Sequence, residues 1–210
     1  MLKKIFLTLM LLVFYTQNTV LALEPKEAEL FMADIGDKVI GILTDSTLSI
    51  SQRNTQFKEI LETKFNLRAI GKFVLGRHWK GASKEEQELF LDLFNATTIA
   101  SYASRFQDYT TEKFDILSSR AEKDGGVTVL TQIIRPNGQK IMIEWKIFEK
   151  KGELRIYDVA LEGISMGITQ RSEFSTIIER TGGKIKGLLD ALNTKVKELI
   201  QKEQILIEHL

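Results

Sequence analysis

Four consecutive segments in the middle of the chain constrain its fold more than any other feature of the sequence. They are rich in β-branched and aromatic residues and cover residues 113–120, 127–135, 140–149 and 153–162. The short spacers between them carry the turn-forming sequences Asp124-Gly125-Gly126, Pro136-Asn137-Gly138 and Lys151-Gly152. Such spacers between strands are typical of hairpins. The sequence therefore predicts an antiparallel meander of about four strands, contained within residues 111–163.

One face of this predicted sheet is strongly apolar. Alternate side chains of a strand point to opposite faces, so the third segment separates into two sets. One set is Ile141, Ile143, Trp145 and Ile147, and the other is Met142, Glu144, Lys146 and Phe148. We therefore expect helices to cover the side of the sheet that carries the first set.

Helical spacing of apolar residues precedes the predicted sheet. It predicts helices over residues 23–43, after Ser51 and over residues 66–75. The sequence of Ser83 and Glu86 fits a capping box, which opens a long helix toward Tyr109. Together these segments form a helical region over residues 23–110.

A second helical region follows the sheet, over residues 168–200. Thr169 or Ser172 is the expected start of its first helix, and Gly182 and Gly183 end that helix. A last helix precedes an amphipathic tail at residues 201–210. The expected fold class is α+β, with residues 23–200 forming a single domain.

The first 22 residues have the pattern of a cleaved signal peptide. Lys3 and Lys4 precede an apolar run over residues 5–15, and Val20 and Ala22 suit the positions before the cleavage site. The apolar run is too short for a bilayer core, which needs roughly 20 residues. Cleavage is expected after Ala22. An exported chain with no cysteine fits a bacterial periplasm.

The composition excludes several classes of function. The absence of cysteine excludes thiol catalysis, a disulfide scaffold and cysteine-based zinc sites. With 29 basic and 28 acidic residues, the chain lacks the basic excess of a dedicated nucleic-acid binder. Nucleotide-binding glycine motifs are absent. His78 has no acidic residue close to it in sequence, so no metal site is predicted there.

The sequence GISMG at residues 163–167 matches the G-x-S-x-G pattern of a serine nucleophile. Asp190 and His209 follow it in the order found in hydrolases. However, that motif belongs to parallel βαβ scaffolds, and the only downstream histidine is the next-to-last residue of the chain. We interpret Ser165 as a turn residue bonded to the backbone, and keep a serine hydrolase as the alternative.

Two segments resemble the MlaC-type family of periplasmic phospholipid carriers, also called toluene-tolerance auxiliary proteins. The first is FNLRAIGKFVLGRHWKGASKEEQELFLDLF, at residues 65–94, and Tyr102 matches the family's continuation of that helix. The second is YDVALEGISMGITQRSEF, at residues 157–174. The chain departs from the family's pattern at Leu154 and Gln170, where aromatic residues are common. The resemblance covers essentially the whole chain after the signal peptide, and it assigns Gly163 and Ser165 to the carrier motif.

The resemblance implies a strongly twisted sheet wrapped by helices, similar to the nuclear-transport-factor-like fold. It implies a deep apolar pocket for the acyl chains of a phospholipid, with no catalysis and no cofactor besides that bound lipid. The implied partners are an outer-membrane lipoprotein–porin complex and an inner-membrane ABC transporter with its substrate-binding ring.

Ten residues are the expected walls of such a pocket: Val74, Leu75, Phe90, Phe94, Tyr102, Met142, Trp145, Tyr157, Val159 and Phe174. An ion pair between Asp158 and Arg171 is expected to hold the sheet end against the following helix, with contact to a partner as the alternative role. Apolar content alone fits a filled core equally well, so a structural or adaptor protein that binds no lipid remains a third hypothesis.

Overall fold

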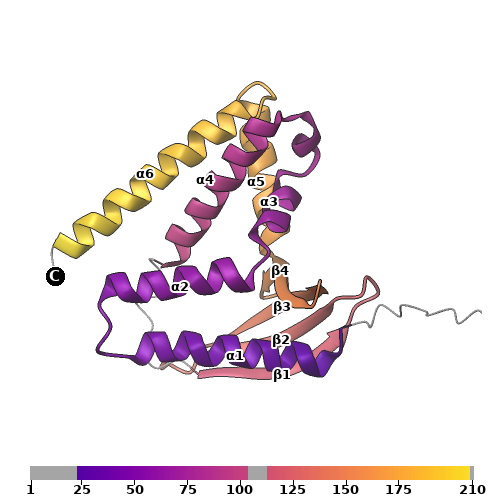
Figure 1. Cartoon of the computed structure of the whole chain (residues 1–210), viewed down its shortest axis with the longest axis vertical. Coiled ribbons are helices and arrows are strands. Elements are labelled where there is room, and N and C mark those ends of the chain that lie inside the picture. The colour runs from indigo at the N-terminus through magenta and orange to yellow at the C-terminus, as the bar shows by residue number, and fades with distance from the viewer. Residues whose placement is uncertain (1–22, 104–112, 209–210) are drawn as a thin grey trace, which may run out of the picture.

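The computed structural model describes residues 23–103 and 113–208 of the chain. Figure 1 shows a mixed arrangement of helices and one antiparallel sheet, which confirms the α+β prediction. The helices before the sheet are α1 (Pro25–Thr44), α2 (Ile50–Lys64), α3 (Leu67–Leu75), the 3-10 helix η1 (Gly76–Gly81) and α4 (Lys84–Ala103). The strands are β1 (Lys113–Ala121), β2 (Val127–Ile134), β3 (Lys140–Lys150), β4 (Glu153–Leu161) and β5 (Ile164–Ser165). The helices after the sheet are α5 (Met166–Arg180) and α6 (Lys186–Glu208).

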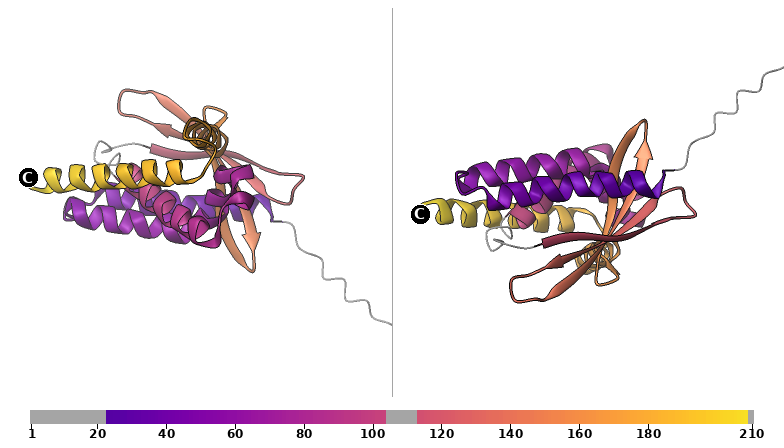
Figure 2. Two further views of the ribbon diagram at one scale, coloured as in Figure 1. Left: turned by 90° about the horizontal axis from the view of Figure 1, so that it is seen from above. Right: turned by 90° about the horizontal axis from the view of Figure 1, so that it is seen from below.

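The sheet is a meander in which each strand pairs antiparallel with the next, in the order β1-β2-β3-β4-β5. The four hairpin strands predicted from the sequence are all present. The fifth strand was not predicted, because its two residues are too few to show any alternation. It is paired to the end of β4 through a tight turn in which Glu162 and Gly163 both have positive φ angles. The strands fan out with a pronounced twist (Figure 2).

A bulge in β4 changes which of its side chains face the helices. Lys146 pairs with Asp158 and Ile147 pairs with Ile156, so Tyr157 has no partner across the strand pair. Because one residue is added there, Ile156 and Val159 both lie on the face of the sheet that carries Ile147 and Trp145. A strict alternation read from the sequence would have placed them on opposite faces.

The apolar face of the sheet packs against α1, as the sequence predicts. This sheet core includes Met32 and Ile35 of α1 together with Val129, Ile147 and Ile156 of the strands. Helix α1 approaches β1 closely at Gly36. A Cβ atom on Gly36 would lie 2.5 Å from Cδ1 of Phe114, so only glycine leaves room for the ring there.

A second core lies among helices α3, α4, α5 and α6. Its centre is an aromatic group in which Phe90 and Phe94 stack with ring centroids 5.9 Å apart. Phe174 of α5 packs edge-on against both rings, at 5.9 Å from Phe90 and 6.5 Å from Phe94. Val74 and Leu75 of α3 are fully or almost fully buried in the same helical core.

The starts of the helices follow local capping, and two of these starts differ from the prediction. The capping box at Ser83 is confirmed: the Ser83 amide donates to Glu86 Oε2 at 2.9 Å and the Glu86 amide donates to Ser83 Oγ at 3.2 Å. Helix α2 begins two residues early, because Ser49 forms its own capping box with Gln52. Helix α5 begins directly after Ser165, not at Thr169 or Ser172.

Two further predictions concern the ends of helices. Helix α4 is described as far as Ala103, and its predicted extension toward Tyr109 lies outside the described residues. Helix α6 continues to Glu208, well into the segment expected to form a separate tail. The resemblance to the nuclear-transport-factor-like fold remains a prediction.

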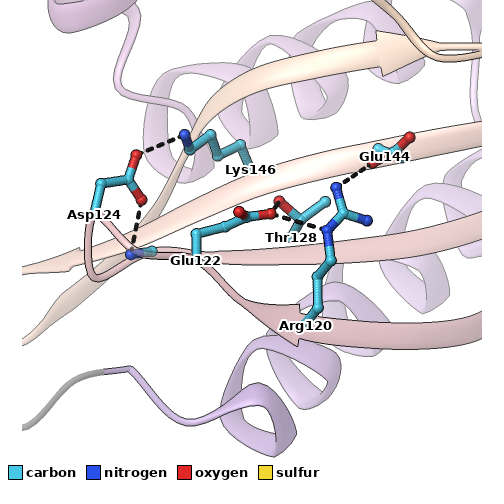
Figure 3. Close-up of polar contacts among 7 residues, drawn as sticks. Arg120, Glu122, Asp124, Thr128, Glu144 and Lys146 are labelled. Carbon is cyan, nitrogen blue, oxygen red and sulfur yellow. Dashed lines mark hydrogen bonds and ion pairs between the residues drawn. The ribbon is translucent and has the colours of Figure 1, made fainter.

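The opposite face of the sheet carries charged side chains (Figure 3). Arg120 pairs with Glu122 at 3.0 Å and with Glu144 at 2.7 Å, and Lys146 pairs with Asp124 at 2.7 Å. The hydrogen bond from Lys146 is the main cause that lowers the pKa of Asp124. These exposed pairs contribute little stability each, but they keep this face polar.

The contact at Gly36 gives a prediction about stability. Gly36→Ala should lower the free energy of unfolding by about 1–3 kcal/mol, because the new Cβ overpacks the Phe114 ring. Gly41→Ala on the same helix is the matched control: a Cβ there meets nothing within 4 Å, and it should raise stability by about 0.5–1 kcal/mol. Urea unfolding of both variants measures the difference. Equal effects of the two substitutions would contradict the close approach.

Candidate functional site

An apolar cavity of about 340 Å³ lies between the sheet and the helices. For comparison, an engineered cavity of roughly 150 Å³ binds benzene. On the side of the helices, the walls are Met32, Ile35, Gly36, Val39, Ile40 and Leu43 of α1, Phe57, Ile60 and Leu61 of α2, Phe65 after α2, Leu67 and Ile70 of α3, Phe94 and Thr98 of α4, and Met166, Gly167 and Gln170 of α5. The sheet contributes Lys113, Phe114, Ile133, Ile143, Trp145, Asp158, Val159 and Leu161.

The cavity occupies the place where the two cores meet without merging. Ile35 and Ile60 belong to the sheet core, whereas Phe94 belongs to the helical core, and all three line the cavity. Protein interiors are normally packed to crystal density with few voids larger than a water molecule. A space of this size with hydrocarbon walls is therefore suited to hold an apolar ligand.

Polar groups are few in the walls. Among the described lining residues, the polar side chains are those of Thr98, Lys113, Asp158 and Gln170. Lys113 and Leu161 are the lining residues that are exposed to solvent, and Leu161 is 40% exposed. Both lie toward the end of the sheet where β1 begins and β4 ends. We therefore place the mouth of the cavity at this end.

Trp145 is held in the cavity wall by a hydrogen bond that points away from solvent. Its indole Nε1 donates to Thr131 Oγ1 at 2.8 Å, and Thr131 is itself completely buried. The ring of Phe65 packs edge-on against the indole with centroids 6.5 Å apart. The polar atom of Trp145 is thus satisfied within the protein, and its apolar ring surface is left for the cavity.

The ten predicted wall residues fall into several places. Phe94, Trp145 and Val159 line the cavity. Val74, Leu75, Phe90 and Phe174 lie in the helical core. Phe94 belongs to the helical core and also lines the cavity. Their contact with a ligand remains a prediction for all of them.

The other three predicted wall residues lie elsewhere. Met142 is on the opposite face of β3 from Ile143 and Trp145, by the alternation of the strand. Tyr157 is the bulged residue of β4, and its hydroxyl accepts a hydrogen bond from Asn66 Nδ2 at 2.7 Å. The side chain of Tyr102 lies outside the described part of the structure.

Sequence reasoning missed the contribution of helices α1 and α2 to the cavity. Their lining residues, such as Val39 and Phe57, follow the ordinary helical spacing of a packed face. A signal was present: the apolar face of β3 needed a cover, and α1 had the length to provide it. Placing α1 against the apolar face of β3 would have identified the lining residues of α1.

The GISMG sequence forms the start of α5. The Ser165 hydroxyl accepts from the Ile168 amide at 3.1 Å and donates to Asp158 Oδ2 at 2.6 Å. The other oxygen of Asp158 accepts from the amides of Gly167, at 3.1 Å, and Val159, at 2.9 Å. Ser165 is therefore a helix cap tied to β4, as the interpretation of it as a turn residue required. His209, the histidine of the hydrolase alternative, lies outside the described residues.

The expected ion pair between Asp158 and Arg171 is wrong. Asp158 caps α5, and the guanidinium of Arg171 lies over the ring of Phe73, 5.3 Å from its centroid. Arg171 also packs against Gly76, where φ is +56° and a Cβ would lie 2.6 Å from Arg171 Nε. The backbone amides at the start of a helix attract a carboxylate strongly, which explains why Asp158 turns to α5 instead.

Two other features are absent from the described residues. No group of three histidine or acidic side chains within 23–103 and 113–208 is arranged to hold a metal ion. No described helix combines the length and the apolar composition needed to cross a membrane.

The fold is similar to that of a solved protein structure. That structure is the phospholipid-binding protein from Ralstonia solanacearum in complex with a phospholipid, which superposes with a TM-score of 0.72 at 18% identity. The match covers 82% of this chain and 98% of the other.

The family is established by sequence. The profile of the family described as MlaC protein matches residues 33–194, and the chain belongs to that family. The intermembrane phospholipid transport system binding protein MlaC of Haemophilus influenzae is 26% identical over 207 residues, which cover 94% of this chain and 93% of that one. The resemblance drawn from two sequence segments is thereby confirmed.

The role of Ser165 as a helix cap leads to a prediction that distinguishes it from a catalytic serine. Ser165→Ala should lower the free energy of unfolding by about 1 kcal/mol, because it removes the acceptor for the Ile168 amide. Ser172→Ala, at an exposed position of the same helix, should leave stability unchanged or raise it by about 0.5 kcal/mol. Urea unfolding measures both. A fluorophosphonate probe should leave Ser165 unlabelled, and stoichiometric labelling would restore the hydrolase.

Proposed function

We propose that this protein binds a phospholipid, encloses its acyl chains in the cavity and carries it through the periplasm. The observation that carries the proposal is the apolar cavity of about 340 Å³ at the meeting of the two cores. Membership in the MlaC family supports it, as do the names of the relatives, which describe phospholipid binding and intermembrane phospholipid transport.

The main physical cost of moving a lipid through water is the exposure of its acyl chains, and an apolar cavity would reduce that exposure. Each methylene exposed to water costs about 0.8 kcal/mol, so two chains of roughly 30 methylenes in total cost on the order of 20 kcal/mol. A soluble carrier offsets most of this cost by enclosing the chains. It must also release them, so its walls should match the interior of a bilayer without greatly exceeding it.

The polar contacts near the cavity are consistent with such a balance. Asp158 is occupied by three hydrogen bonds from the protein, and Trp145 and Thr131 satisfy each other. None of these groups is left to hold a ligand tightly. Hydrocarbon contacts are non-directional, so walls of this kind accept chains without requiring one exact shape.

The proposed route follows from the family and from the start of the sequence. Residues 1–22 would direct export and be removed. The carrier would then exchange lipid with an outer-membrane lipoprotein–porin complex and with an inner-membrane ABC transporter and its substrate-binding ring. Neither a catalytic step nor a cofactor is part of this proposal.

The two alternatives fit the structure less well. A serine hydrolase needs the Ser165 hydroxyl to donate to a histidine base, whereas here it donates to Asp158 and accepts from the Ile168 amide as a helix cap. An adaptor with a filled interior does not account for a cavity of about 340 Å³.

Protein exported to the periplasm and purified without detergent should carry phospholipid. Organic extraction followed by mass spectrometry should find it in the same gel-filtration fractions as the protein. Cytosolic protein of similar size, purified in parallel, is the control for lipid carried over from membranes. Lipid-free protein that also takes up none from vesicles would contradict the proposal.

Filling the cavity from α1 tests the location of the ligand. Ile40 is half-buried in the cavity wall, so Ile40→Trp should reduce the lipid bound per protein several-fold. Leu30→Trp is the matched control, because Leu30 is on the same helix and 60% exposed. The measurement is extracted lipid per protein, with circular dichroism to confirm folding. An equal loss of lipid in both variants would place the ligand elsewhere.

A further inference from the structure

We propose that the side chain of Gln170 donates a hydrogen bond to an ester carbonyl of the bound lipid. This inference rests on the proposed function and extends it from the acyl chains to the groups that join those chains to glycerol. Gln170 lines the cavity from α5, and it is half-buried.

The helical spacing of α5 places Gln170 on the face that points into the protein. Gly167, Phe174 and Ile178 are the buried residues of this helix. Residues three and four positions apart lie on one face of a helix. Gln170 is three residues after Gly167 and four before Phe174, so it belongs to the same inward stripe.

The other polar residues of the lining do not need a ligand. The Asp158 carboxylate accepts three hydrogen bonds from the protein. Lys113 shares a cross-strand row with Lys140, and the alternation of the strands turns that row away from the cavity. The hydroxyl of Thr98 is able to bond to a backbone carbonyl of its own helix, as the hydroxyl of Thr97 does at 2.7 Å.

The side-chain amide of Gln170 differs from these groups. It forms no hydrogen bond with any residue of 23–103 or 113–208. Water can reach a half-buried amide while the cavity holds no lipid, but acyl chains that fill the cavity displace that water. Because an amide without a partner is costly to bury, a ligand with an acceptor near Gln170 is favoured over a plain hydrocarbon.

The acceptor that fits this position is an ester carbonyl of the lipid, not its phosphate. Gln170 lies one turn along α5 from Gly167, whose amide donates to Asp158 Oδ1 at 3.1 Å. A phosphate beside Gln170 would therefore come close to a carboxylate, and like charges repel. An ester carbonyl is neutral, and it lies at the boundary between the chains and the headgroup. That boundary corresponds to the half-buried position of Gln170 in the wall.

The size of the expected effect is that of one neutral hydrogen bond. Its loss should lower the preference for an ester-linked lipid about two- to tenfold. Salt should change this preference little, because neither partner is charged.

The test compares two phospholipids that differ only in the linkage of their chains. Full-length mature protein is incubated with vesicles that contain equal amounts of a phosphatidylglycerol with two oleoyl esters and its analogue with two oleyl ethers. Both lipids are then measured in the protein fraction. Gln170→Met, which keeps the length of the side chain but has no N–H donor, should lower the ratio of ester to ether lipid. Gln201→Met is the matched control: it is the same substitution at an exposed position of α6, outside the cavity lining.

Use of the same vesicles for every variant cancels any difference in how readily the two lipids leave the bilayer. Binding of the ether lipid is the internal check that a variant is folded. An unchanged ratio in Gln170→Met, with both lipids bound, would overturn the inference and leave the proposed function standing. An equal fall in Gln201→Met would also overturn it. If the unmodified protein bound neither lipid, the proposed function would fail, and this inference with it.

Discussion

The whole structure depends on two hydrophobic cores that meet without filling the space between them. The sheet core needs a cover for the apolar face of β3, and α1 provides it at Met32 and Ile35. The helical core closes on itself through the rings of Phe90, Phe94 and Phe174. Buried apolar side chains stabilise each core separately, and the cavity lies between the two.

A few directional bonds keep the two cores at this separation. The Asn66 side chain donates to Tyr157 and its amide donates to the carbonyl of Ile156, which joins the start of α3 to β4. The Asp158 carboxylate binds the first turn of α5. Both connections fall on β4 close to its bulge. The bulge therefore aims Ile156 and Val159 toward the helices and frees Tyr157 and Asp158 for the bonds that position them.

The sequence predicted the elements well because each has a local cause. Short glycine turns determine the hairpins, and the capping box at Ser83 determines the start of α4. The start of α5 was predicted too late, since Ser165 had been considered mainly as a turn residue. Its role as a cap depends on Asp158, seven residues earlier in a different element. The two-residue strand β5 likewise depends on pairing and has no pattern of its own.

The walls of the cavity were harder to predict for a physical reason. A side chain that contacts a lipid and one that contacts another side chain both need only to be apolar, so Val74 and Val159 look alike in sequence. Three-dimensional placement separates them: Val74 has no exposed surface and belongs to the helical core, whereas Val159 faces the cavity beside Trp145.

Polar residues carry the information that apolar ones lack. Along an apolar wall, a charge is stable only where it is bonded or reaches water. Asp158 meets the first condition through three hydrogen bonds, and Lys113 meets the second through its exposure at the end of the sheet. The exposed lining residues lie at one end of the sheet, so the cavity has a closed end defined by packing and an open end defined by solvent. An amphiphilic ligand has the same asymmetry, and under the proposed function this match would orient it in the site without any contact specific to its chains.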